Sequence, residues 1–218
     1  MSIQLILGPM FSGKTTELIR QGRRAQLAGK KVLYVKHSLD CKRYSPDDPN
    51  ATNVRVHHDV GGNEQGEEAL IAENLFEIWT ALCSPKVQVI CIDEGQFFRD
   101  LRSMCTFLVN VHRKSVIVAA LNATYRKEMF PSIVDLLPIA TGVQWLTAIC
   151  FRCGSDQATF TKRRSQPQLE IGQHPIFGES IDPLVRTHIS FILLHNLFFP
   201  THSYVFVAKM TLGLDRNI

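Results

Sequence analysis

The chain has 218 residues, of which 45% are hydrophobic and 20% charged, and its formal net charge at pH 7 is +4. The hydrophobic share excludes a mostly disordered protein, and the length predicts one large domain, alone or with a small appendage. The net charge is too small to indicate a nucleic-acid partner, and no apolar run approaches the ~20 residues that a membrane-spanning helix needs, so we expect neither a nucleic-acid nor a membrane partner.

The cysteines and histidines are unevenly distributed. The N-terminal residues show no basic stretch followed by an apolar one, so we expect no secretory signal, a cytoplasmic protein and reduced thiols. All six cysteines lie within residues 1–172, whereas residues 173–218 contain none and hold four of the eight histidines. This imbalance indicates a chain made of two unlike parts.

The first 150 residues alternate short apolar runs with longer amphipathic stretches, a pattern typical of parallel α/β folds. From the N-terminus we expect a strand at 3–7, a helix at 14–28, a strand at 32–35, a long loop with room for a short edge hairpin at 37–66, and a helix at 67–83. A buried strand at 87–92, a helix at 100–112, a strand at 115–121, a helix at 130–137 and a last strand at 143–149 follow. The predicted fold class is therefore α/β, with a mainly parallel sheet of four or five strands flanked by helices.

A glycine-rich loop between the first strand and helix fits the phosphate-binding pattern G-x-x-x-x-G-K-[ST]. Its residues are Gly8, Pro9, Met10, Phe11, Ser12, Gly13, Lys14 and Thr15. In such a loop backbone N–H groups surround a phosphate, the following helix presents its positive end, the lysine reaches the β and γ phosphates, and the hydroxyl binds Mg²⁺. A chance match on an ordinary strand-turn-helix is the weaker interpretation, because the required strand and helix are both predicted.

Asp93 and Glu94 follow the buried strand at 87–92, at the edge of the sheet where ligands gather in open α/β folds. Asp93 is suited to the Mg²⁺ shell, as in other nucleoside triphosphatases of this type. Glu94 is then free to act as a general base or to position the attacking hydroxyl or water. The alternative is an acidic pair that merely caps a strand. Beside the phosphate loop, the pair predicts a site for ATP and Mg²⁺.

Several motifs, in order, make the chain resemble the type II thymidine kinases, the deoxynucleoside kinases of cellular and poxvirus type. They are GPMFSGKTTE at residues 8–17, RYS at 43–45, HD at 58–59, DEGQFF at 93–98, VIVAAL at 116–121, LTAICFRC at 146–153 and TKR at 161–163. The resemblance implies a P-loop NTPase-type nucleoside kinase domain over residues 1–146. It also implies a partial zinc-knuckle and lasso segment over 147–172, followed by a divergent tail over 173–218.

The resemblance implies a role for each matching residue. Glu94 matches the family's catalytic base, which takes the proton from the 5′-hydroxyl of thymidine as it attacks the γ-phosphate of ATP. Thr15 and Asp93 are implied as Mg²⁺ ligands, and Arg43 and Gln96 as further contacts to the nucleotide. The positions implied to line the thymine pocket are Met10, Phe97, Leu121, Tyr125 and Thr161. The family also implies ATP and thymidine as substrates and a homo-tetrameric assembly.

Cys150 and Cys153 have the spacing of one thiolate pair in a zinc knuckle, which needs four ligands. In the family a second pair follows, and a lasso-shaped loop between the pairs closes over thymidine. Here the pattern ends after Gly172, and no further cysteine follows. In one interpretation His174 or His188 supplies the missing ligands. In the other, which we prefer, the tail is foreign to the kinase and the zinc site is incomplete.

These observations leave three hypotheses about function. The leading one is ATP-dependent phosphorylation of thymidine at its 5′-hydroxyl to give dTMP, in the salvage supply of DNA precursors. The second is a catalytically impaired splice or gene-model variant that binds ATP but lacks a complete substrate lid. The third is another ATPase of the same fold that acts on nucleic acid, and the lack of a basic and aromatic binding track argues against it.

Overall fold

The computed structural model describes residues 1–41, 53–54, 67–163 and 181–184. Within this part of the chain, seven strands form one sheet in the order β3-β4-β2-β5-β6-β1-β7, and two further strands pair as β8-β9. All neighbours in the main sheet run parallel except β3, which is antiparallel to β4. The predicted α/β class with a mainly parallel sheet is therefore confirmed.

The bounds of the elements are as follows. The strands are β1 Ser2–Gly8, β2 Val32–His37, β3 Asn53–Val54, β4 Glu67–Ala72, β5 Val89–Ile92, β6 Ser115–Leu121, β7 Gly142–Trp145, β8 Phe160–Arg163 and β9 Ile181–Leu184. The helices are α1 Lys14–Leu27, α2 Ser38–Cys41, α3 Trp79–Leu82, α4 Leu101–Asn110 and α5 Pro131–Leu136, with 3₁₀ turns η1 Leu75–Ile78, η2 Gly95–Phe97 and η3 Leu137–Ile139. No helix among the described residues has the length and apolar character needed to cross a membrane.

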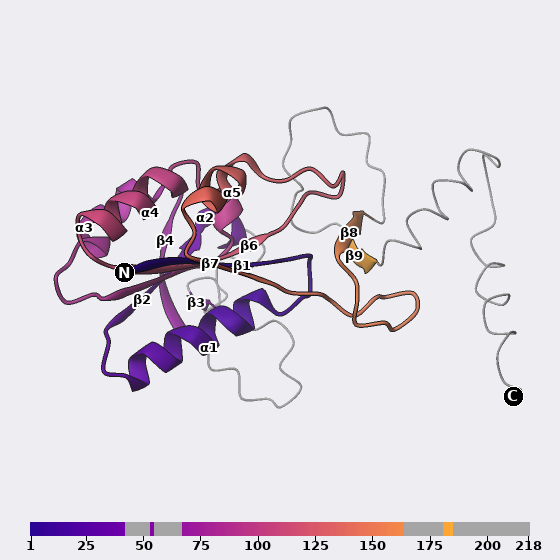
Figure 1. Cartoon of the computed structure of the whole chain (residues 1–218), viewed down its shortest axis with the longest axis horizontal. Coiled ribbons are helices and arrows are strands. Elements are labelled where there is room, and N and C mark those ends of the chain that lie inside the picture. The colour runs from indigo at the N-terminus through magenta and orange to yellow at the C-terminus, as the bar shows by residue number, and fades with distance from the viewer. Residues whose placement is uncertain (42–52, 55–66, 164–180, 185–218) are drawn as a thin grey trace, which may run out of the picture. The chain divides into compact units, whose positions relative to one another are not determined.

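Helices cover both faces of the sheet, with α1 on one face and α3, α4 and α5 on the other (Figure 1). Successive residues of a strand point to opposite faces, and β5 follows this rule. Val89 and Cys91 pack toward α1, whereas Ile90 and Ile92 pack toward α4 and α5. Because both faces are covered, β5 can be apolar at every position, which is why its sequence is a continuous apolar run.

The predicted helix at 67–83 is wrong in its first half. Residues 67–72 form β4, which pairs in parallel with β2, and helical turns begin only at Leu75. The segment EEALIA consists mostly of good helix formers, but such propensities amount to tenths of a kcal/mol per residue and yield to sheet pairing. Ala69 and Ala72 are the residues that this strand buries. The other differences are smaller: the sheet has more strands than expected, and α2 lies in the predicted loop.

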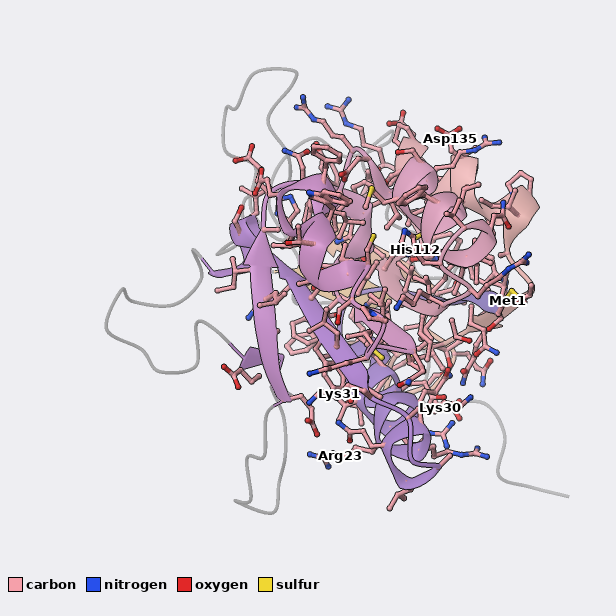
Figure 2. All side chains as sticks on the ribbon, turned by 90° about the vertical axis from the view of Figure 1, so that its left-hand side faces the viewer. Met1, Arg23, Lys30, Lys31, His112 and Asp135 are labelled. Carbon is pink, nitrogen blue, oxygen red and sulfur yellow. The ribbon has the colours of Figure 1, made fainter. Side chains whose placement is uncertain are left out.

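The exposed side of α1 is basic. Arg20 donates to Glu17 at 2.6 Å and Arg23 donates to Glu67 of β4 at 2.9 Å, and both arginines are exposed. Arg23, Lys30 and Lys31 lie on this side of the molecule, whereas His112 and Asp135 lie across the sheet from them (Figure 2). Exposed ion pairs of this kind contribute little stability, so α1 is held mainly by its buried face.

Gly22 marks the closest approach of α1 to the sheet. A Cβ added at Gly22 would lie 2.7 Å from Cζ of Tyr34 in β2, and closer still to its hydroxyl oxygen. That hydroxyl is buried and has no hydrogen-bond partner among the described residues. Only a glycine lets the helix rest on this aromatic ring.

We predict opposite effects for two substitutions at this contact. Gly22→Ala should lower the free energy of unfolding by about 1–3 kcal/mol, because the added methyl overpacks the contact. Tyr34→Phe should raise it by about 1 kcal/mol, because it removes an unsatisfied buried hydroxyl. In the double variant the methyl occupies the space of the lost hydroxyl, so the penalty of Gly22→Ala should shrink. Urea denaturation followed by circular dichroism measures all three; a harmless Gly22→Ala would contradict the close packing.

Candidate functional site

The candidate site lies where β5, β6 and β1 end, side by side in the sheet. The phosphate-binding loop follows β1, Asp93 and Glu94 follow β5, and Leu121 ends β6. In a parallel sheet the carboxyl ends of neighbouring strands meet at one edge, so segments distant in sequence come together. The register pairs Gly8 of β1 with Leu121 of β6.

The phosphate-binding loop has the backbone curvature that its sequence predicts. Phe11 and Gly13 both have left-handed conformations, with φ of 62° and 80°, and α1 begins at Lys14. The Lys14 side chain is buried, and its Nζ donates to the Pro9 carbonyl oxygen at 2.6 Å; Ser12 Oγ donates to the same oxygen at 2.9 Å. The loop thus holds a lysine ammonium at the N-terminus of a helix, an arrangement suited to an anionic phosphate.

A glycine is needed at position 8 because another backbone segment lies directly against it. The N–H of Leu146 donates to the Leu7 carbonyl oxygen at 2.7 Å, so the segment after β7 runs directly against the end of β1. A Cβ at Gly8 would lie 2.8 Å from the Leu146 carbonyl oxygen. Any side chain at the first glycine of the motif would therefore collide with the backbone at Leu146.

Asp93 is buried on the α1 side of the sheet, because it continues the alternation of Val89 and Cys91. Thr15 Oγ1 donates to its two carboxylate oxygens at 3.1 and 3.3 Å. Burial raises the pKa of the Asp93 carboxyl to about 7, and the charges of Glu94 and Asp40 act in the same direction, while hydrogen bonds from Thr15 and the Glu94 N–H lower it. A buried carboxylate beside a hydroxyl offers the hard oxygen donors that Mg²⁺ prefers, so these residues fit that ion.

Glu94 is held in place by Gln96. Glu94 has a left-handed backbone, with φ of 52° and ψ of 41°, which turns the chain sharply away from β5. Gln96 Nε2 donates to Glu94 Oε2 at 2.5 Å, and Gln96 Oε1 accepts the N–H of Leu121 at 3.0 Å. The Gln96 backbone oxygen also accepts Ser132 Oγ at 3.0 Å. The buried glutamine thus links the carboxylate to β6 and α5, and leaves Glu94 half-buried at the edge of the site.

Of the five residues predicted to line a thymine pocket, two are joined directly: the Met10 N–H donates to Thr161 Oγ1 of β8 at 3.1 Å. Leu121 belongs to the apolar cluster against which Met10 packs. Phe97 is buried and contacts the His37 ring, with centroids 5.6 Å apart. Tyr125 is half-buried, and its hydroxyl accepts Arg126 Nε at 3.2 Å. Arg43 lies outside the described residues.

A buried ion pair that was not predicted from the sequence lies beside the site. Lys36 Nζ lies 2.8 Å from Asp40 Oδ2, with only 2% and 4% of the two side chains exposed. Lys36 falls on the α1 side of β2, the side that Asp93 occupies on the neighbouring β5, and the Asp93 N–H donates to the Val35 carbonyl oxygen at 2.9 Å. A lysine within an apolar run, followed four residues later by an aspartate, is the signal that could have indicated it.

The cysteine pair lies on a tight turn of its own. The Cys150 N–H donates to the Ser155 oxygen at 2.6 Å, the Gly154 N–H donates to the Cys150 oxygen at 2.9 Å, and Gly154 has a φ of 70°. Cys150 is buried and Cys153 exposed. Among the described residues no group of three or more potential metal ligands exists. His174 and His188 lie outside this part of the chain, so two thiols are all that the described residues offer to zinc.

Comparison with known proteins points to one family. The thymidine kinase family model matches residues 1–178. The thymidine kinase of fowlpox virus (strain NVSL) is 43% identical over 162 residues, which are 74% of this chain and 83% of the relative. The thymidine kinase of vaccinia virus (strain Western Reserve) is 42% identical over 161 residues, 74% of this chain and 82% of the relative. The cytosolic thymidine kinase of Bos taurus is 41% identical over 161 residues, 74% of this chain and 61% of the relative.

The raised pKa of Asp93 predicts a pH-dependent effect of Asp93→Asn. The ordinary value is 3.8 and the folded value about 7, so the folded protein binds the proton more tightly than the unfolded chain. Stability is therefore lost as the pH rises from about 4 to about 7. In magnesium-free buffer, Asp93→Asn should be increasingly more stable than the unsubstituted protein across this range, by up to about 4 kcal/mol. Denaturation at a series of pH values measures the difference, and a pH-independent difference would contradict the assigned burial.

Proposed function

The chain belongs to the thymidine kinase family, and we propose that it transfers the γ-phosphate of ATP to the 5′-hydroxyl of thymidine, giving dTMP for the salvage supply of DNA precursors. The observation that carries the proposal is the acidic pair beside the phosphate-binding loop. Asp93 accepts a hydrogen bond from Thr15, and Glu94 accepts one from Gln96, so the two neighbouring carboxylates have separate partners. This separation supports two different chemical roles.

The phosphate-binding loop is proposed to hold the triphosphate of ATP. Its backbone N–H groups and the N-terminus of α1 attract the anion, and Lys14 exchanges its bond to the Pro9 oxygen for one to a phosphate oxygen. Gly8, Met10, Phe11, Ser12 and Gly13 shape this backbone. Arg43 is proposed as a further phosphate contact on the strength of its motif.

Thr15 and Asp93 are the residues that would hold Mg²⁺. Bound Mg²⁺ neutralises charge on the β and γ phosphates. The protein's own contribution is to keep one hydroxyl and one carboxylate at the end of β5, where the hydrogen bond between them orients both. The nearby Asp40 is itself held in an ion pair by Lys36.

Glu94 is proposed as the general base. Phosphoryl transfer needs chiefly positioning and charge neutralisation, together with one acceptor for the hydroxyl proton. Gln96 holds one carboxylate oxygen, Oε2, and so restricts the orientation of this half-buried carboxylate. Met10, Phe97, Leu121, Tyr125 and Thr161 are proposed to surround the thymine ring, where an aromatic face and apolar side chains suit a methylated pyrimidine.

Two further properties are proposed from the family alone: a homo-tetrameric assembly and a cytoplasmic location. A structural zinc site takes four ligands, and among the described residues no third potential ligand joins Cys150 and Cys153. We therefore propose that these two cysteines form an incomplete zinc site.

We predict that Glu94→Gln abolishes most of the activity without preventing nucleotide binding. Glutamine keeps an acceptor for Gln96 Nε2 but cannot take a proton, so kcat for dTMP formation should fall by about 10²- to 10⁴-fold. The affinity for a non-hydrolysable ATP analogue should change less than about threefold, because no phosphate contact is assigned to this residue. A radiolabelled thymidine assay and calorimetric titration measure the two quantities.

Glu77→Gln is the matched control, since Glu77 is exposed on η1 and should leave both quantities unchanged. No dTMP from a folded, ATP-binding unsubstituted protein would contradict the proposed function and favour the impaired-variant hypothesis. Stimulation of ATP hydrolysis by DNA, without dTMP formation, would favour the nucleic-acid ATPase.

We predict clearly less than one zinc per chain in the purified protein, measured by mass spectrometry. Iodoacetamide should modify Cys153 well before Cys150, because only Cys153 is exposed. One full equivalent of zinc, with both thiols protected, would show that residues beyond the described ones complete the site.

A further inference from the structure

The segment from Leu146 to Thr161 leaves the main sheet after β7 and returns to the phosphate-binding loop, where Thr161 contacts Met10. It leaves where the Leu146 N–H donates to the Leu7 oxygen, at 2.7 Å. Its two arms are joined by paired hydrogen bonds of 2.9 and 3.0 Å between Ala148 and Ala158, beyond which the cysteine turn lies. The return arm is the part that reaches the nucleoside side of the site.

Two side chains fasten the return arm to the loop. Asn122 Nδ2 donates to the Thr159 carbonyl oxygen at 3.1 Å, and the Met10 N–H donates to Thr161 Oγ1 at 3.1 Å. We call this pair of hydrogen bonds the loop latch. Asn122 also donates its own N–H to the Gly8 oxygen at 3.2 Å, so one residue contacts the start of the phosphate-binding loop and the return arm together.

The chemistry of the latch restricts which side chains can form it. The partner of Asn122 is a carbonyl oxygen, so the side chain must supply a donor, which a carboxylate at neutral pH cannot do. The partner of Thr161 is an N–H group of the loop itself, so the side chain must supply an acceptor. Thr161 is 8% exposed, and losing this acceptor would leave a shielded N–H unsatisfied.

We propose that Asn122 and Thr161 are positioning residues that couple the phosphate-binding loop to the nucleoside side of the site. This proposal rests on the proposed function. The loop latch restrains Met10, which belongs to the phosphate-binding loop and is also proposed to line the thymine pocket. The loop conformation that binds ATP and the shape of the thymidine pocket are therefore linked. Because coupling between two sites is reciprocal, each substrate should then increase the affinity for the other.

The latch is also independent of metal. All its donors and acceptors are protein groups between Gly8 and Thr161, and neither cysteine takes part. The return arm can therefore be held against the loop in a chain whose zinc site is incomplete.

The test compares Asn122→Asp, Thr161→Val and Thr161→Ser with the unsubstituted protein, all treated with 1,10-phenanthroline before assay with Mg²⁺. Asn122→Asp places an acceptor against a carbonyl, and should raise KM for thymidine about fivefold to tenfold while kcat changes less than threefold. The affinity for thymidine should no longer increase when the non-hydrolysable ATP analogue is present. Thr161→Ser retains the acceptor and should keep that increase, whereas Thr161→Val should lose it.

Thr141→Val is the matched control. It removes a threonine hydrogen bond of 2.8 Å to the Ile3 oxygen, at the opposite end of β1, and should leave KM and the coupling unchanged. If Asn122→Asp has no effect on KM, or if Thr141→Val has the same effect, the proposal is overturned.

A measurement that needs no catalysis separates this proposal from the proposed function. Amide hydrogen exchange of Met10 should be slow in the unsubstituted protein and in Thr161→Ser, and at least tenfold faster in Thr161→Val. Equal exchange in all three would overturn the latch even in an active enzyme. Slow exchange in a protein that makes no dTMP would support the latch and refute the proposed function.

Discussion

The hydrogen bond between Thr15 and Asp93 is the interaction on which the site depends. It joins the first turn of α1 to the end of β5, and it requires a carboxylate to lie inside the protein rather than at its surface. Burying such a group is unfavourable unless polar partners surround it. Two donors meet part of this requirement, because Thr15 Oγ1 and the Glu94 N–H both donate to the Asp93 carboxylate, whereas the charges of Glu94 and Asp40 oppose it. A bound cation would offset the cost of burying the Asp93 carboxylate more than any neutral partner could.

Glu94, the next residue, avoids the cost of a fully buried carboxylate because its side chain is only half-buried. The left-handed backbone at Glu94 places its side chain at the edge of the site, while Gln96 reaches back to hold it. Gln96 in turn is anchored on β6 through the Leu121 N–H. The residue proposed to hold Mg²⁺ and the residue proposed as the base are thus neighbours with unlike burial, and their placement depends on the register of β5 beside β6.

The sequence predicted the centre of this arrangement better than its margins. The phosphate-binding loop, β5 and the acidic pair were predictable because each depends on a local signal: a glycine pattern, a β-branched run, and the charges directly after that run. The strand at 67–72 was not, because its residues favour a helix and only the pairing with β2 makes it a strand. The loop latch could not be predicted from the sequence either, because Met10 and Thr161 are 151 residues apart and no local pattern links them.

The position of β1 has a consequence for the synthesis of the protein. Its two neighbours in the sheet are β6 and β7, so the first strand made has no partner until residues 115–121 and 142–145 exist. At ribosomal rates this interval is on the order of ten seconds. Throughout it the nascent chain carries an apolar strand with free edges, the kind of segment that chaperones recognise. The nucleotide-binding loop, attached to the end of that strand, is therefore among the first parts to be translated and the last to be completed.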